Sequence, residues 1–594
     1  MTRPWLAAGL LAAGLSPARE SPPRRPNVVV ILADDQGWGD LGLHGNTNLA
    51  TPHIDSLGRD GAAVRHFYVS PVCAPTRAEF LTGRYYPRTG VHGTSARAER
   101  MNLDEKTIAE VFRAAGYATG AFGKWQDGSQ SPYHPNARGF DSFYGFTQGH
   151  LGHYFDAALE EDGWPVRGRG FVADDLTDRA LEFVERNRAR PFLCYVAYNT
   201  PHSPMQVPDR FYDRFARAEL PLRASEPGRE DLAHTRAALA MVENLDWNVG
   251  RLLARLNALS LARDTVVLYF SDNGPNGHRW NGGLKGLKGS VDEGGIRSPL
   301  LVRWPGRIRP GTTVVPIAAA VDLLPTLAEL ARVPVVGTKP LDGRSLAPLL
   351  LGRAADWPER RLFAFRGRGE VSVRTQRFRL DPQGRLFDIE ADSGQEKDVA
   401  GVHPGVAAEL RRAAEVMERE VFAGEGRDDR PLPVGHARRT ELTAGDATFA
   451  GSVAPQQPLP EQLLLHGMDR YRRRAHLGRG GGAGGRIRSR GAPCVSGLGR
   501  RRHPRAGLRG ARGQDGGPPG ARPAPHRGRA GPRSPPGVVR EGLPAPRAGH
   551  PRAGRGAGAA HLAGRGHPGR AGARSLVGGA HAPVRSRPAL PAAP

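Results

Sequence analysis

Short apolar runs recur along the first 270 residues, and most of them end in polar side chains. Four of these runs lack the alternation of a half-exposed strand, and they lie at residues 27–32, 118–122, 191–198 and 265–270. Such runs are typical of strands covered on both faces. Between them, apolar residues follow the three- and four-residue steps of a helix, around residues 108–115, 176–184 and 245–256. Strands that alternate with helices predict an α/β fold whose large, mostly parallel sheet is flanked by helices.

The pattern changes after Gly306. Residues 322–330 predict a helix with an early proline, and residues 362–389 contain short alternating runs that favour a small antiparallel sheet. A helix near residues 404–421 follows. We therefore predict five parts of the chain, namely a leader at 1–25, a catalytic domain at 26–350, an antiparallel-sheet subdomain at 351–425, a linker at 426–465 and a tail at 466–594.

The formal net charge of +25 belongs almost entirely to the tail. Residues 469–594 hold 27 arginines, no lysine and 3 acidic residues, whereas the preceding residues hold 57 basic and 56 acidic ones. The tail is rich in Arg, Gly, Pro and Ala and lacks apolar periodicity, which predicts disorder. Either it is an arm that binds nucleic acid or another polyanion, or it is a frameshifted translation of a GC-rich gene. The absence of lysine favours the frameshift, so we assign the tail no function and expect no nucleic-acid partner.

Three cysteines cannot form a disulfide framework, and Cys194 lies in an apolar run that is typical of a packing residue. Cys494 falls in the tail. The first residues combine an early arginine with an apolar stretch at residues 5–15, which resembles a secretory signal peptide; a disordered leader is the alternative. We expect export to the periplasm or the extracellular space. No later segment is long and apolar enough to span a bilayer.

Polar side chains follow each of the four predicted strands. They are Asp34 and Asp35, Lys124, His202, and Asp272 with Asn273. Each alone is unremarkable, since adjacent aspartates usually cap helices or face solvent and Asp-Asn-Gly is a common turn. Because ligands of parallel sheets bind beyond the carboxyl ends of the strands, we expect these residues to share one site. Three carboxylates and one amide form an all-oxygen set that suits Ca²⁺.

Cys73 begins a Cys-x-Pro-x-Arg run, and the residues from Thr76 onward can start a helix. A helix N-terminus attracts anions, and Arg77 adds a permanent charge. A buried thiol beside a structural arginine is the simpler alternative. Lys288 lies in a glycine-flanked loop, where backbone can approach a ligand closely. Together the lysines, the arginine, a cation and a histidine meet the needs of sulfate-ester cleavage. This chemistry further predicts a Cys73 sulfur open to solvent.

Taken together, these motifs resemble type I, formylglycine-dependent sulfatases of the alkaline phosphatase superfamily, which include the arylsulfatases. The resemblance extends over about residues 26–425. It rests on segments at residues 26–40, 51–55, 73–83, 123–125, 138–141, 200–204, 271–274 and 289–299.

The resemblance implies hydrolysis of an aryl, sugar or alkyl sulfate through a sulfated-enzyme intermediate. A maturating enzyme would convert Cys73 to formylglycine, which would attack sulfur and complete a Ca²⁺ site made by Asp34, Asp35, Asp272 and Asn273. Arg77 would support the formylglycine, Lys124 and Lys288 would bind sulfate oxygens, and His202 would aid the leaving group. The alcohol half of the substrate would meet loops at residues 128–136 and 147–169.

One position departs from the family pattern. The family usually has histidine two residues after the lysine of Gly-Lys-Trp, where this chain has Gln126. An amide cannot accept a proton near neutral pH, so we expect slower turnover unless His134 folds back to replace it. A tolerated variant in an active enzyme and a catalytically silent homologue are the alternatives. A phosphate or phosphonate monoester hydrolase of the same superfamily is the other enzymatic alternative.

Overall fold

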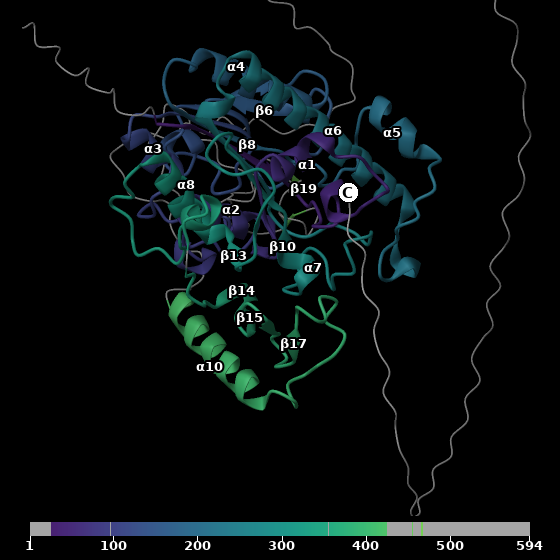
Figure 1. The fold of residues 1–594 in the computed structure, drawn as a ribbon. Helices are drawn as coiled ribbons and strands as arrows, with labels where there is room; N and C mark the ends of the chain where they lie inside the picture. The colour runs from purple at the N-terminus through teal and green to yellow at the C-terminus, as the bar shows by residue number, and fades with distance from the viewer. Residues whose placement is uncertain (1–24, 96, 355, 424–453, 456–464, 467–594) are drawn as a thin grey trace, which may run out of the picture. The chain divides into compact units, whose positions relative to one another are not determined.

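The computed structural model describes residues 25–95, 97–354, 356–423, 454–455 and 465–466 (Figure 1). The predicted leader, except Arg25, lies outside these residues. So do the tail and the linker, apart from the short paired strands β18 (Ala454–Pro455) and β19 (Leu465–His466). The described helices include none that combines the length and the apolar character needed to cross a membrane.

A ten-stranded sheet forms the centre of the catalytic domain. Its order is β12 (Thr312–Val314), β2 (Ala62–Val64), β11 (Leu300–Arg303), β9 (Thr265–Ser271), β1 (Asn27–Ala33), β8 (Phe192–Ala197), β4 (Ala118–Lys124), β5 (Ser142–Phe146), β6 (Ala158–Glu161) and β7 (Trp164–Arg167). The five strands from β9 to β5 are parallel, whereas β11, β6 and β7 join by antiparallel pairing. The predicted α/β sheet is therefore confirmed as a mixed sheet with a parallel centre.

Helices cover both faces of this sheet, as the non-alternating strands predict. Along β1, Val28, Val30 and Leu32 pack into one core together with α2 (Cys73–Thr82), α3 (Ile108–Ala114) and α8 (Leu323–Ala331). Val29, Ile31 and Ala33 face the opposite core, which contains α1 (Pro52–Arg59), α4 (Val172–Arg186) and α6 (Leu232–Ala258). All seven residues of β1 are buried, so the strand carries no solvent-facing side.

The C-terminal subdomain is a four-stranded antiparallel sheet with one helix. Its strands are β14 (Leu362–Gly367), β15 (Glu370–Arg374), β16 (Phe378–Leu380) and β17 (Leu386–Asp388), and α10 (Pro404–Val421) packs against it (Figure 1). The remaining elements are α5 (Asp209–Ala216), α7 (Glu293–Ile296), α9 (Ala347–Leu350) and the small sheet of β10 (Arg297–Ser298), β3 (Phe67–Tyr68) and β13 (Ala318–Ala319). The predicted antiparallel sheet is confirmed.

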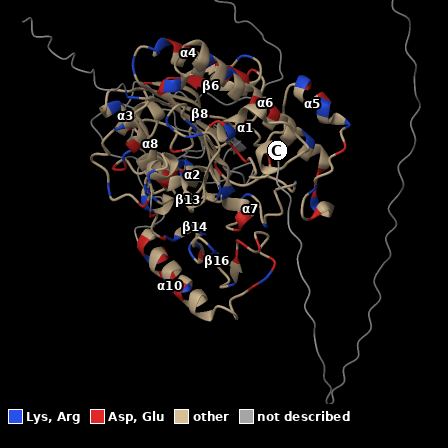
Figure 2. Cartoon of the chain, viewed as in Figure 1, with Lys and Arg blue, Asp and Glu red and all other residues tan. Residues whose placement is uncertain are grey.

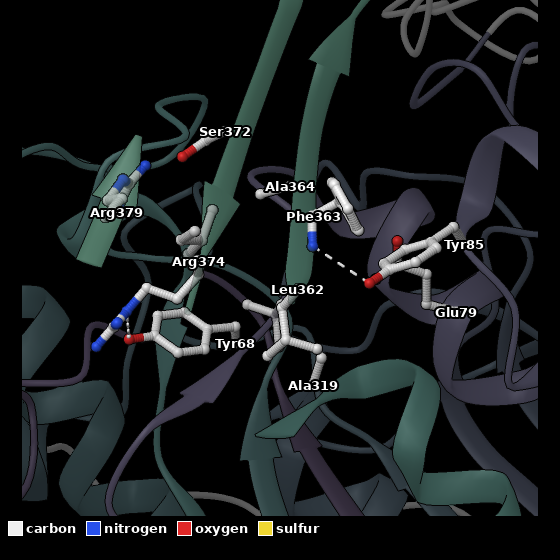
Figure 3. Close-up of a pocket in the computed structure, with 12 residues that line it drawn as sticks. Tyr68, Glu79, Tyr85, Ala319, Leu362, Phe363, Ala364, Ser372, Arg374 and Arg379 are labelled. Carbon is white, nitrogen blue, oxygen red and sulfur yellow. Dashed lines mark hydrogen bonds between the residues drawn. The ribbon is translucent and has the colours of Figure 1, made fainter. Parts of the chain in front are cut away.

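Polar contacts join this subdomain to the catalytic domain (Figure 3). Arg374 Nε donates to the Tyr68 hydroxyl at 2.7 Å, and the Phe363 backbone N–H donates to the Tyr85 hydroxyl at 3.2 Å. The cavity between them has a volume of about 10 Å³. That volume holds about one water molecule, so this junction is a packed interface rather than a substrate site.

Lysines and arginines are interspersed with acidic residues along α5 and α10 (Figure 2). Such mixed faces agree with the near-zero net charge of the chain before the tail. Over these helices the molecule carries no extended single-sign surface of the kind that nucleic acids favour.

The ionisation of Asp246 makes the stability of the fold depend on pH. Its Oδ1 accepts the backbone N–H groups of His53 and Ile54 at 2.9 and 2.7 Å, which ties α6 to the start of α1. Burial raises the pKa of Asp246 to about 7. Because the folded-state pKa lies above the unfolded one, this group's contribution to stability is fully present below the unfolded pKa and is lost as pH rises toward 7.

We therefore expect Asp246→Asn to raise the free energy of unfolding at pH 8 by a few kcal/mol relative to wild type, and by less at pH 5. Asparagine keeps a carbonyl oxygen for both N–H groups and carries no charge. Denaturant unfolding at the two pH values measures the difference. Asp231, which caps α6 at an exposed position, provides the control Asp231→Asn. An Asp246→Asn effect that is equal at both pH values would contradict the assignment.

Candidate active site

The carboxyl ends of four adjacent parallel strands meet at one edge of the sheet. Asp34 and Asp35 follow β1, Lys124 ends β4, and Asp272 and Asn273 follow β9. His202 follows β8 by five residues. Each of these six side chains is buried, with at most 3 % of its surface exposed. The strand order β9–β1–β8–β4 brings them together although they are up to 239 residues apart in the chain.

Candidate metal-ligating atoms converge at this edge. One oxygen each of Asp34 and Asp272 and the Cys73 sulfur lie within 4.8 Å of one another. The same limit holds for Asp34, Asp35 and a ring nitrogen of His202. The Asp35 backbone N–H donates to Asp272 Oδ1 at 3.1 Å, and Asp35 adopts a left-handed φ of 67°. The turn after β1 therefore directs two successive aspartates into one cluster.

Three cationic side chains surround these carboxylates. Lys124 Nζ lies 2.7 Å from Asp34 Oδ2, Lys288 Nζ lies 2.8 Å from Asp35 Oδ1, and Arg77 Nη2 lies 2.7 Å from Asp272 Oδ2. Arg77 also donates to the Lys124 backbone carbonyl at 3.0 Å. Each carboxylate is thereby held by its own cation, and Arg77 links α2 to two strand ends.

Burial and mutual repulsion oppose full ionisation of the three carboxylates. Burial raises the pKa of Asp272 to about 7, and the negative charge of Asp34 adds to the rise. Burial acts in the same direction on Asp34, but Lys124, His202 and Arg77 outweigh it and hold the pKa of Asp34 below its ordinary value. A divalent cation among these carboxylates would relieve the repulsion that remains.

Two buried oxygens in the cluster are available to bind such a cation. Asp34 Oδ1 and Asn273 Oδ1 are buried acceptors that have no hydrogen-bond donor among the described residues. Asn273 Nδ2 donates to Asp35 Oδ1 at 2.8 Å, which orients its amide oxygen away from that carboxylate. Unpaired buried acceptors beside three carboxylates fit a hard cation such as Ca²⁺, which takes carboxylate and amide oxygens.

Cys73 is the first residue of α2, three residues before the predicted helix start. Thr76 ties this helix to β9, because its hydroxyl donates to the Asp272 backbone carbonyl at 2.6 Å. The expectation of a solvent-open sulfur is wrong, since Cys73 is only 2 % exposed. α2 carries the sulfur into the interior beside the Asp34 and Asp272 carboxylates.

Gly123 explains why a glycine must precede Lys124. It has a φ of 121°, and a Cβ atom there would lie 1.8 Å from the Ala197 carbonyl oxygen of the neighbouring strand. Any side chain would force β4 away from β8 and displace Lys124 from Asp34. Cys194, by contrast, is fully buried on β8 within an apolar core, and burial raises the pKa of its thiol, in accord with a packing role.

His202 presents one ring nitrogen to the cluster. Its Nδ1 lies 2.7 Å from the Ser203 carbonyl oxygen, and its Nε2 lies 3.5 Å from Asp35 Oδ2. Because a carbonyl only accepts, Nδ1 carries hydrogen and Nε2 is left for a ligand. Burial lowers the pKa of His202, while Asp35 and Asp34 oppose this effect.

Gln126 follows Lys124 by two residues and is fully buried. Its Nε2 donates to the Thr94 carbonyl at 2.8 Å, its backbone N–H donates to Thr147 at 3.3 Å, and its φ is 59°. Its Oε1 is buried without a donor among the described residues. His134 does not replace it, because its ring nitrogens contact Glu160 at 3.3 Å and the Asn136 backbone N–H at 3.3 Å.

Two further residues shape this site and were missed in the sequence. The ring of His150 lies 4.5 Å from that of His202 in an edge-to-face arrangement. Arg279 pairs with Asp40 at 2.6 Å and donates to the Asp35 carbonyl at 3.0 Å, which braces the turn after β1. Both lie in loops without a periodic pattern, so only their long-range contacts reveal them.

Comparisons with known proteins agree with this geometry. The model of the Sulfatase family matches residues 26–333, and a model described as N-sulphoglucosamine sulphohydrolase, C-terminal, matches residues 288–393. Human arylsulfatase A is 32 % identical over 69 % of this chain and 89 % of its own length. Mouse steryl-sulfatase is 34 % identical over 59 % of this chain and 68 % of its own.

A solved structure is similar over most of its length. The crystal structure of Ps i-CgsB in complex with k-i-k-neocarrahexaose has a TM-score of 0.59 and 29 % sequence identity, and the match covers 66 % of this chain and 93 % of that one.

Proposed function

The chain belongs to the sulfatase family and is a sulfuric ester hydrolase, and on that premise we propose that the cluster around Cys73 cleaves a sulfate monoester with Ca²⁺ and a formylglycine derived from Cys73. One observation carries the proposal. The Cys73 sulfur lies within 4.8 Å of carboxylate oxygens of Asp34 and Asp272, in a cluster that also contains Lys124 and Arg77. A simple packing thiol has no need of such neighbours.

Asp34, Asp35, Asp272 and Asn273, completed by the modified Cys73, would hold the cation. When present, the cation and the aldehyde supply a Lewis acid and a hydrated, nucleophilic oxygen directed at sulfur. Because Cys73 is 2 % exposed in the folded chain, a maturating enzyme would have to act before folding is complete. The predicted secretory leader agrees with modification during export to the periplasm or the extracellular space.

Lys124 and Lys288 would bind the sulfate oxygens. Burial disfavours a charged Lys288, but Asp35 and Cys73 outweigh it and raise its pKa, so its ammonium stays charged. Each ammonium has three N–H donors and uses some of them to bind Asp34 or Asp35, so the remaining donors can bind an anion. Arg77 is fully buried and would hold Asp272 and the Cys73 helix in register.

In its doubly protonated form, His202 would donate a proton to the leaving oxygen through Nε2, since Nδ1 keeps its hydrogen directed at the Ser203 carbonyl. Gln126 would place an acceptor oxygen beside the reaction without taking a proton. This feature supports the second candidate, a catalytically slow sulfatase.

The test separates sulfatase from phosphatase. We expect turnover of 4-nitrophenyl sulfate to exceed that of 4-nitrophenyl phosphate, and the peptide that carries Cys73 to have the lower mass of formylglycine. Faster phosphate turnover would favour the alternative phosphate or phosphonate hydrolase. An unmodified thiol in inactive protein would favour the silent homologue. Relatives are named for aryl, steryl and N-acetylgalactosamine sulfates, so the alcohol half remains open among aryl, sugar and alkyl groups.

Gln126→His is expected to raise kcat for 4-nitrophenyl sulfate by at least about 10-fold, because a general base contributes about 10²- to 10⁴-fold. Histidine tolerates the left-handed φ of this position better than most residues, so the variant should fold. Steady-state kinetics measure the change, and Gln126→Asn, which keeps an amide, is the matched control. No rise in kcat with histidine would show that proton removal does not limit turnover.

A further inference from the structure

A cavity of about 520 Å³ opens between the loop after β4 and the hairpin β6–β7. It lies at the carboxyl end of β5, beside the end of β4 that carries Lys124, because Phe146 lines it and pairs with Lys124 in the sheet. Volumes of about 300–1,000 Å³ are typical of small-molecule sites. The cavity is therefore large enough for a ligand and lies next to the strand end that carries Lys124.

Two polar side chains that line the cavity each carry one buried atom without a hydrogen-bond partner among the described residues. Gln130 is 5 % exposed, its Oε1 accepts from Ser129 at 3.0 Å, and its Nε2 has no acceptor. Asn136 Nδ2 donates to Asp162 at 2.9 Å, and its Oδ1 has no donor. Both atoms are buried away from the cavity, and a rotation of either side chain would present its unpaired group to a ligand there.

The cavity also has an aromatic wall and an acidic one. Trp164 lines it and is 61 % exposed, an uncommon state for so large an apolar side chain. His134 accepts the Asn136 backbone N–H through Nδ1, so its Nε2 carries hydrogen and donates to Glu160 at 3.3 Å. Glu160 keeps further acceptor capacity toward the cavity.

The charge of the residues that line the cavity indicates which kind of ligand it would bind. Glu160 and Asp162 are the charged lining residues, and neither lysine nor arginine lines the cavity. A sulfate or uronate group would be repelled here and drawn to Lys124 and Lys288 instead. A ligand with uncharged hydroxyl groups and an apolar ring face matches the polar side chains of Gln130, Asn136 and Glu160 and the tryptophan.

We propose that this cavity is a subsite for an uncharged sugar ring that neighbours the sulfated ring of a saccharide substrate. The proposal rests on the proposed function, which it narrows from any sulfate monoester to sulfated saccharides with a neutral adjacent residue. Trp164 would stack on the ring, while Gln130, Asn136 and Glu160 would bind its hydroxyl groups.

The full chain is tested on an array of neutral and uronate-containing oligosaccharides, each in sulfated and unsulfated form. We expect the wild-type chain to bind oligosaccharides with neutral rings, whether sulfated or not. Binding should be at least about 10-fold weaker in Trp164→Ala, because alanine cannot stack on a sugar ring. Trp247→Ala, a change at another exposed tryptophan, is the matched control and should bind as wild type.

Kinetics supply a second readout. For any sulfated saccharide that is hydrolysed, the ratio of its kcat/KM to that for 4-nitrophenyl sulfate should fall at least about 10-fold in Trp164→Ala. Equal binding of uronate saccharides, unchanged binding by Trp164→Ala, or no saccharide binding at all would overturn the subsite. Saccharide binding that depends on Trp164 in a protein without sulfatase activity would sink the proposed function and leave the subsite standing.

Discussion

Cys73→Ala is expected to abolish hydrolysis of 4-nitrophenyl sulfate, with kcat lowered by at least about 10⁴-fold. Alanine keeps the β-carbon but lacks the thiol whose oxidation would turn that carbon into the proposed aldehyde. The position is 2 % exposed at the start of α2, and a smaller apolar residue fits there without strain. Steady-state kinetics on the purified variant, compared with wild type of known Cys73 conversion, measure the loss.

Cys194→Ala is the matched control, since Cys194 is an equally buried thiol packed in a core on β8. It should lower the free energy of unfolding by about 1 kcal/mol and retain turnover. A Cys73→Ala protein that still hydrolyses the ester would refute the assigned nucleophile. Wild-type turnover with an unmodified thiol at Cys73 would refute formylglycine while keeping the site.

The sequence was most informative where burial alone decides structure. The runs that became β1, β4, β8 and β9 are apolar on both faces, so their pattern predicts both strands and covering helices. Their polar ends then identify a shared edge, because parallel strands present their carboxyl ends together. The helix predicted near residues 404–421 is α10, for the same reason of a clear helical period.

The pattern of hydrophobic and polar positions did not predict the short and half-exposed strands. β2, β11 and β12 have three or four residues each, too few for a period to show. β6 and β7 are largely exposed and form a local hairpin across Asp162 and Gly163, which was missed in the sequence. The pairing of β2, β11 and β12 is decided by contacts with strands that are distant in the chain, which local sequence does not encode.

Within the site, the sequence identified the candidate residues but did not show which segments surround them. The sequence indicates Cys73 as a site residue but does not show that it is buried, because segments from other parts of the chain bury α2 along its whole length. It names Gln126 as a departure but not the Thr94 and Thr147 contacts that fix the amide. His150 and Trp164 acquire meaning only once the loops that carry them are placed.

Removal of divalent cations by EDTA is expected to abolish turnover and lower the unfolding midpoint, and Ca²⁺ should restore both. Asp34, Asp35 and Asp272 are fully buried, and the proposed cation offsets their repulsion beyond what Lys124 and Arg77 achieve. A ligand at about 100 times its Kd stabilises the folded state by about 2.7 kcal/mol, so the shift should be measurable by calorimetry. Mg²⁺ should restore less, because irregular all-oxygen sites suit Ca²⁺.

The variant Asn273→Asp tests the same cation site through protein stability, without an activity assay. Asn273 Nδ2 donates to Asp35 Oδ1 at 2.8 Å, a contact that a carboxylate would turn into repulsion. We expect the variant to lose at least about 2 kcal/mol more stability in EDTA than in Ca²⁺, since bound cation compensates a fourth carboxylate. Asn27→Asp is the matched control, because Asn27 is buried at the opposite end of β1 and donates to Thr265 at 3.2 Å. Its loss of stability should be the same in both conditions. If the two variants respond alike to Ca²⁺, the cation does not bind at the carboxyl end of β1.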